Sequence, residues 1–188
     1  MQLKMQGDFA FHIGYILTLL LAAGLTFVVL KWPRGVQYTF SQHVAPRNSS
    51  SIFYSLLFIV TLTLLLIFFA SYFIPAYELP IPFKQLLVIS CVAQILCTFF
   101  PERGKEKTKI HRVFAGISAA CLPMLLAILA AWPTINGFDK ILTGACFIIM
   151  LAILCLAIFT ELRKTHALIL QIAYNVAFFV PILFIAYL

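Results

Sequence analysis

Charged residues are scarce in this chain, and acidic residues are the scarcest. Only 10% of the 188 residues are Asp, Glu, Lys or Arg, against roughly 25% in a soluble domain. The six acidic residues all lie at the edges of apolar runs or between them: Asp8, Glu78, Glu102, Glu106, Asp139 and Glu161. Ion-coupled transporters usually place an ionisable residue inside a membrane span. The lack of a carboxylate there argues against a proton-driven transporter.

Motifs of known chemistry are lacking as well. The five cysteines lie inside apolar runs and form no CxxC or Cys/His spacing, so we predict small buried side chains and no metal site. No GxSxG or HExxH motif occurs. His111 and His166 stand at the edges of apolar runs, too shallow for a haem held between two helices. The sequence therefore predicts no metal and no cofactor.

Apolar residues, in contrast, are abundant. They make up 63% of the chain, and mean hydropathy is +1.06. Six apolar runs cover approximately residues 9–30, 52–74, 83–100, 113–132, 141–160 and 167–188. Each approaches the roughly 20 residues that cross about 30 Å of hydrocarbon as a helix. We predict an all-α, polytopic membrane protein, with one domain over residues 1–188 folded as a six-transmembrane-helix bundle.

Basic residues are concentrated in alternate loops. Ten of the thirteen lie in the loops after the first, third and fifth runs: Lys31, Arg34, Arg47, Arg103, Lys105, Lys107, Lys109, Arg112, Arg163 and Lys164. Lys4, Lys84 and Lys140 lie on the opposite side. By the positive-inside rule these three loops are cytoplasmic and both termini are outside, in the cell membrane. The net charge of +7 is thereby explained without a nucleic-acid partner.

A few polar residues lie deep in the apolar runs. Gln94 is in the third run, and Gln171, Tyr174 and Asn175 are in the sixth, spaced three and four apart so that they share one helix face. We expect this face to point into the bundle, where it either forms interhelical hydrogen bonds or lines a ligand site. Pro123 predicts a kink in the fourth helix that frees a carbonyl near Ala119.

A second group of polar residues gathers at the membrane boundary on the side of the basic loops. It consists of Ser41, His43, Glu102, His111, Glu161 and Arg163. Three readings stay open: a site for a lipid headgroup or an anion, a catalytic serine–histidine–carboxylate cluster, and a solvated face that sets topology. Because Pro101 ends the third helix, we predict that Glu102 and His111 contact residues 41–43 while residues 104–108 stay solvated.

Three short segments carry a family resemblance. "YTFSQHVAP", "FFPE…IHRVFAGISA" and "TELRKTH" resemble segments of the domain-of-unknown-function family 998, which is related to the DRAM and FRAG-like six-helix membrane proteins. The matching positions are Thr39, Ser41, Phe100, Pro101, Glu102, His111, Ala115 and Gly116. Phe40 and Gln42 depart from the residues usual in the family, and Glu102 stands at the acidic position where the family has Asp. The resemblance implies six helices, a membrane location, a lipid-related role by analogy, and motif loops on the non-cytoplasmic side, opposite to the charge-based orientation.

Three functional hypotheses follow. The leading one is a non-catalytic bundle that binds a lipid or a membrane partner through its boundary loops. The alternatives are a membrane-embedded lipid-modifying enzyme and an accessory subunit of a larger membrane complex. Small residues permit close helix packing, either within the bundle or against a partner protein or second copy: Gly14, Gly24, Gly116, Ser118 and Gly144.

Overall fold

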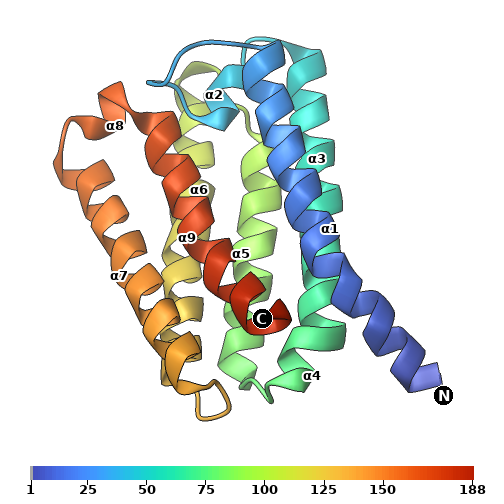
Figure 1. Ribbon diagram of the computed structural model, residues 1–188. Coiled ribbons are helices and arrows are strands. Elements are labelled where there is room, and N and C mark those ends of the chain that lie inside the picture. The colour runs from blue at the N-terminus through green and yellow to red at the C-terminus, as the bar shows by residue number, and fades with distance from the viewer. Residues whose placement is uncertain (1) are drawn as a thin grey trace.

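The fold is an all-α bundle of six long helices, as the sequence predicts. The computed structural model describes residues 2–188, with side chains from Phe9 onward. The long helices are α1 (Gln2–Lys31), α3 (Asn48–Phe68), α5 (Ile81–Phe99), α6 (Gly104–Ala131), α7 (Gly137–Phe159) and α9 (Ala167–Tyr187) (Figure 1). Six helices, with α3 extended to Ala76, are long and apolar enough to cross a membrane.

Short helices fill the connections. α2 (Phe40–Val44) and α8 (Leu162–Thr165) lie at one end of the bundle, together with the α5–α6 connection (Figure 1). We call this end, which carries ten of the thirteen basic residues, the basic end. α4 (Ile74–Ala76), the α6–α7 connection and both chain termini lie toward the other end, the terminal end (Figure 1).

The structure extends several of the predicted helices beyond their apolar runs, and α6 and α3 are the clearest cases. α6 begins at Gly104 rather than near residue 113, because Lys, Glu and Arg are good helix formers and continue the helix into solvent. Residues 104–107 are exposed, as predicted for this segment, although they are helical rather than a loop. α3 passes through a π-helical turn, Phe69–Phe73, into α4, just before Pro75 removes one backbone donor.

Packing between neighbours is uneven. α5 packs along α6, α1 along α3, and α7 along both α6 and α9, whereas α9 meets α1 and α6 at only a few places. The large apolar core lies in the middle and toward the terminal end, where Phe68, Phe69, Phe73, Phe83 and Phe178 are buried. Near the basic end a smaller cluster joins α1, α2 and α3. The bundle is therefore closely filled at one end and more open at the other.

The small residues divide into two groups. A Cβ atom on Gly14 would lie 2.7 Å from the ring of Phe68 and against the Tyr187 hydroxyl, and one on Gly24 would lie 2.5 Å from Leu57. These glycines of α1 allow close approach within the bundle. At Gly116 and Gly144 a Cβ atom would meet nothing within 4 Å.

Candidate functional site

The short helix α2 is held in place by its own sequence. The Thr39 side chain accepts a hydrogen bond from the backbone N–H of Gln42, and Gln42 Oε1 accepts one from the backbone N–H of Thr39 at 3.0 Å. This reciprocal pair is a capping box, typical of a Thr-x-x-Gln segment at a helix start. Gln171 Oε1 of α9 accepts the backbone N–H of Phe40 at 3.0 Å, which satisfies another free donor of α2.

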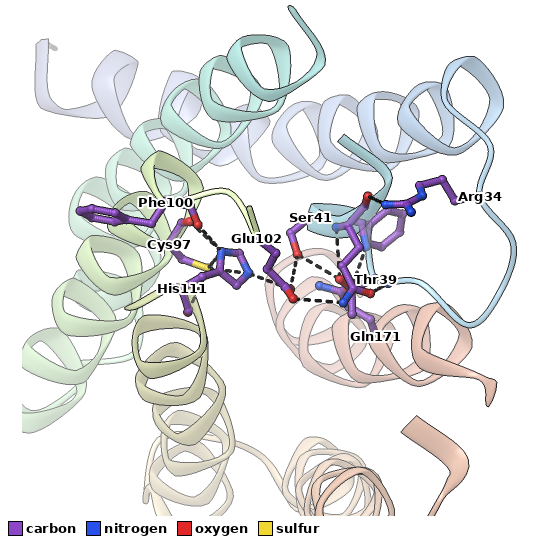
Figure 2. A network of polar contacts seen from close by, with 10 residues as sticks. Arg34, Thr39, Ser41, Cys97, Phe100, Glu102, His111 and Gln171 are labelled. Atoms are coloured by element: carbon purple, nitrogen blue, oxygen red, sulfur yellow. Dashed lines mark hydrogen bonds and ion pairs between the residues drawn. The ribbon is translucent and has the colours of Figure 1, made fainter. Parts of the chain in front are cut away.

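Glu102 lies at the centre of a polar network between α2 and the α5–α6 connection (Figure 2). Ser41 Oγ donates to Oε1 of Glu102 at 3.1 Å, and Gln42 Nε2 donates to Oε2 at 3.0 Å. The Glu102 side chain is only 10% exposed. The predicted contact between Glu102 and residues 41–43 is thus present in the structure.

His111 reaches this network from the first turns of α6 (Figure 2). Its Nδ1 lies 2.9 Å from the carbonyl oxygen of Cys97 and 3.0 Å from that of Phe100, so Nδ1 carries a proton and donates to the free carbonyls that end α5. Its Nε2 lies 3.5 Å from Glu102 Oε1. With the proton on Nδ1, both Nε2 and the Glu102 carboxylate are acceptors, so a hydrogen bond between them needs a proton on one of the two. His111 is therefore linked to Ser41 only through Glu102.

Of the remaining members of the predicted boundary cluster, Arg163 lies near this network, whereas Glu161 and His43 lie apart. Arg163 is exposed on α8 and faces the same hollow as Ser41 and His111. Glu161 is exposed and forms an ion pair of 2.6 Å with Lys164, outside the Glu102 network. His43 is buried on another side of α2, where its Nδ1 lies 2.9 Å from the carbonyl oxygen of Trp32. The structure brings together Ser41, Glu102, His111 and Arg163, but not Glu161 or His43.

A hollow runs from the basic end into the bundle. Its outer part, the vestibule, has a volume of about 640 Å³, and its inner part, the inner cavity, of about 240 Å³. Both are lined by Ser41, His111, Arg163 and Gln171, so they adjoin each other. The vestibule also carries the exposed cations Arg112 and Lys164.

The predicted polar face of α9 lines the inner cavity. Gln171, Tyr174 and Asn175 line it from α9, and Gln94 lines it from α5. The Tyr174 hydroxyl donates to the carbonyl of Ala119, the group that the kink at Pro123 was predicted to free. Among the described residues no hydrogen bond involves the side chains of Gln94 and Asn175, so two amides stay available at the inner end.

Sequence reasoning missed several residues that build the site. Gln42 and Thr39 shape α2, and the Thr-x-x-Gln spacing was the signal that could have revealed them. Arg103 joins the α5–α6 connection to the α2–α3 connection. It donates to the Ala45 carbonyl and, at 2.5 Å, to Asn48 Oδ1. Cys97 places its Sγ 3.4 Å from His111 Nε2, a contact that no spacing rule reveals.

Among the residues that the structure describes, no group of three or more His, Cys, Asp or Glu side chains is arranged to hold a metal ion. Comparisons of the chain with models of protein families, with curated proteins and with solved structures find no significant match.

Proposed function

We propose that this membrane protein is a non-catalytic binder of a lipid whose headgroup occupies the vestibule and whose neighbouring polar group reaches the inner cavity. One observation carries the proposal: a largely apolar cavity with a few polar side chains lies between the helices and adjoins a vestibule edged with cations. Ligand sites are typically concave, largely apolar, and supplied with a few placed polar groups. The resemblance to family 998, whose relatives have lipid-related roles, favours the same proposal.

The inner end favours a neutral polar group. Gln94 and Asn175 each offer a carbonyl acceptor and two N–H donors. A side-chain amide among apolar groups is stabilised by a hydrogen bond to any polar partner. No charged side chain accompanies them at that depth in the described cavity lining, where Arg163 lies at the outer edge. An ester carbonyl or a hydroxyl of a lipid matches these donors and acceptors.

The vestibule favours an anionic headgroup. Arg112 and Arg163 line it at the basic end, where they supply charge-assisted donors, and Lys164 lies beside them in its ion pair with Glu161. Glu102 is the acidic residue of its lining, and this carboxylate is occupied by hydrogen bonds from Ser41 and Gln42. The net charge of the vestibule is therefore positive.

The catalytic alternative has weaker support from the geometry. A serine nucleophile needs a base that accepts its proton and that a third group orients. Here the Ser41 hydroxyl donates to Glu102, and His111 approaches Glu102 from the other side. Glu102 stands between the serine and the histidine, in an order that holds α2 in place rather than activating Ser41.

We further propose that the basic end faces the cytoplasm and that the protein resides in the cell membrane. The uneven distribution of lysine and arginine supports this orientation.

The proposal is tested by identifying what the purified protein retains. Native mass spectrometry of the protein released from detergent should show a bound lipid, with anionic lipids such as phosphatidylglycerol preferred over phosphatidylcholine. Asn175→Leu should lower lipid occupancy several-fold, because it removes an amide from the inner cavity. Ala173→Leu is the matched control, since it places the same side chain on the exposed side of α9.

A second pair of variants tests the headgroup. Arg163→Gln combined with Lys164→Gln should reduce the preference for anionic lipid, whereas Lys105→Gln with Lys107→Gln, outside the vestibule, should not. The proposal fails if the wild-type protein retains no lipid. It also fails if Asn175→Leu and Ala173→Leu retain lipid equally.

A further inference from the structure

We propose that the protein has a second ligand site, for a phosphate group, in a pocket of about 310 Å³ at the basic end. The pocket lies between the end of α1 and the turn that joins α2 to α3, and its lining includes Lys31, Trp32, Arg34, His43 and Arg47. None of these residues lines the vestibule. The site is therefore separate from the proposed lipid site, and we call it the His43 pocket.

His43 is the observation that points to a ligand. It is 2% exposed, and its Nδ1 lies 2.9 Å from the Trp32 carbonyl oxygen, to which it donates. Its Nε2 is buried and has no hydrogen-bond partner among the described residues, although the side chain lines the pocket. Buried ring nitrogens are normally paired, because an unpaired polar atom loses its water without replacement. A ligand oxygen in the pocket would supply the partner.

The charge of the pocket selects an anion. Lys31, Arg34 and Arg47 all line it, and its described lining contains no acidic residue. The ion pairs found in the described part of the chain are Glu102 with His111 and Glu161 with Lys164, so none of the three cations is neutralised by a carboxylate. Arg34 is already oriented, since Nη1 donates to the Gln42 carbonyl at 2.8 Å and the guanidinium lies 4.3 Å from the Tyr38 ring centroid.

Phosphate fits this combination better than a singly charged anion does. Its several oxygens can accept forked bonds from arginine and point-charge contacts from lysine at the same time. The neutral His43 ring accepts from a protonated phosphate oxygen at Nε2, and the doubly protonated ring donates there instead. Trp32 lines the pocket and packs against the rings of Phe27 and Phe53, and tryptophan is enriched where membrane proteins meet lipid headgroups.

The geometry of α2 explains why one short helix serves two sites. Successive residues of a helix are rotated by about 100°, so Ser41 and His43 point to nearly opposite sides. Ser41 faces Glu102 and the vestibule, and His43 faces the end of α1.

Trp32 provides the reporter for a test. In the full chain carrying Trp132→Phe, Trp32 is the single tryptophan, and inorganic phosphate at constant ionic strength should change its fluorescence in a saturable way. Lys31→Gln with Arg47→Gln should raise the Kd roughly tenfold or more, since two charge-assisted contacts are lost. Both residues are exposed, so folding should be unaffected. Lys105→Gln with Lys107→Gln removes the same charge elsewhere at the basic end and should leave the Kd within about twofold.

A second variant and a second probe identify the ligand. His43→Asn keeps a donor near the Nδ1 position, removes Nε2, and should also weaken phosphate binding. Nanodiscs containing phosphatidic acid, compared with phosphatidylcholine alone, distinguish a lipid phosphate from a free one. If only phosphatidic acid changes Trp32 emission, the ligand is a lipid headgroup. If inorganic phosphate changes Trp32 emission in both bilayers, the ligand is a soluble phosphate. The inference is overturned if neither probe changes Trp32 emission, or if both double variants weaken the response equally.

Discussion

Glu102 is the residue on which the basic end depends most. Its two oxygens accept hydrogen bonds from Ser41 and Gln42 of α2, and one of them also faces His111 of α6. A carboxylate that is only 10% exposed loses much of its hydration, and these charge-assisted contacts compensate for that loss. The side chain thereby ties α2 to the start of α6.

Glu102→Ala should lower the free energy of unfolding by roughly 1–3 kcal/mol, because it leaves the buried Ser41 hydroxyl and the half-buried Gln42 amide without their acceptor. The measurement is the midpoint of thermal unfolding in detergent. Glu106→Ala, in the exposed first turn of α6, is the matched control and should leave the midpoint nearly unchanged. Equal midpoints for the two variants would show that the network contributes nothing to stability.

Among the elements, α1 depends on close approach to its neighbours. Gly14→Ala places a methyl group 2.7 Å from the Phe68 ring and against the Tyr187 hydroxyl, both on other helices. Phe68 is 1% exposed and has little room to move. We expect a loss of about 1–3 kcal/mol in stability, the usual cost of overpacking.

Gly116→Ala offers the opposite case within the same bundle. It also replaces a helical glycine, but its Cβ atom meets nothing within 4 Å. Alanine is the better helix former, so a gain of up to about 1 kcal/mol is expected. If both variants shift the unfolding midpoint in the same direction, close packing at Gly14 is not the cause.

The six long helices were predictable because a chain crossing hydrocarbon must satisfy its backbone hydrogen bonds within the segment, and the apolar runs show the length of each crossing. Hydropathy does not reveal α2 or the start of α6 at Gly104, since capping and helix propensity act there rather than apolar character. The shared face of Gln171, Tyr174 and Asn175 followed from helical spacing, and Tyr174 meets the carbonyl freed by Pro123. Partners across the bundle, such as Cys97 with His111, depend on how helices pack, which spacing along one helix does not encode.

For the whole molecule, the distribution of basic residues predicts orientation. A reporter fused after Leu188 should be found outside the cytoplasm, because ten of the thirteen lysines and arginines lie at the opposite end. The measurement is reporter activity in cells, with a second reporter inserted within residues 104–108 as the internal control. Activity of the Leu188 fusion in the cytoplasm would instead favour the topology implied by family 998.

The dense aromatic core closes the bundle toward the terminal end. Phe69, Phe73 and Phe83 are fully buried there, whereas the hollow opens at the basic end. A guest in the hollow therefore faces a wall of packed rings on the side of the terminal end. Movement from the hollow toward that end would require these rings to separate, at the cost of the apolar contacts that hold the core together.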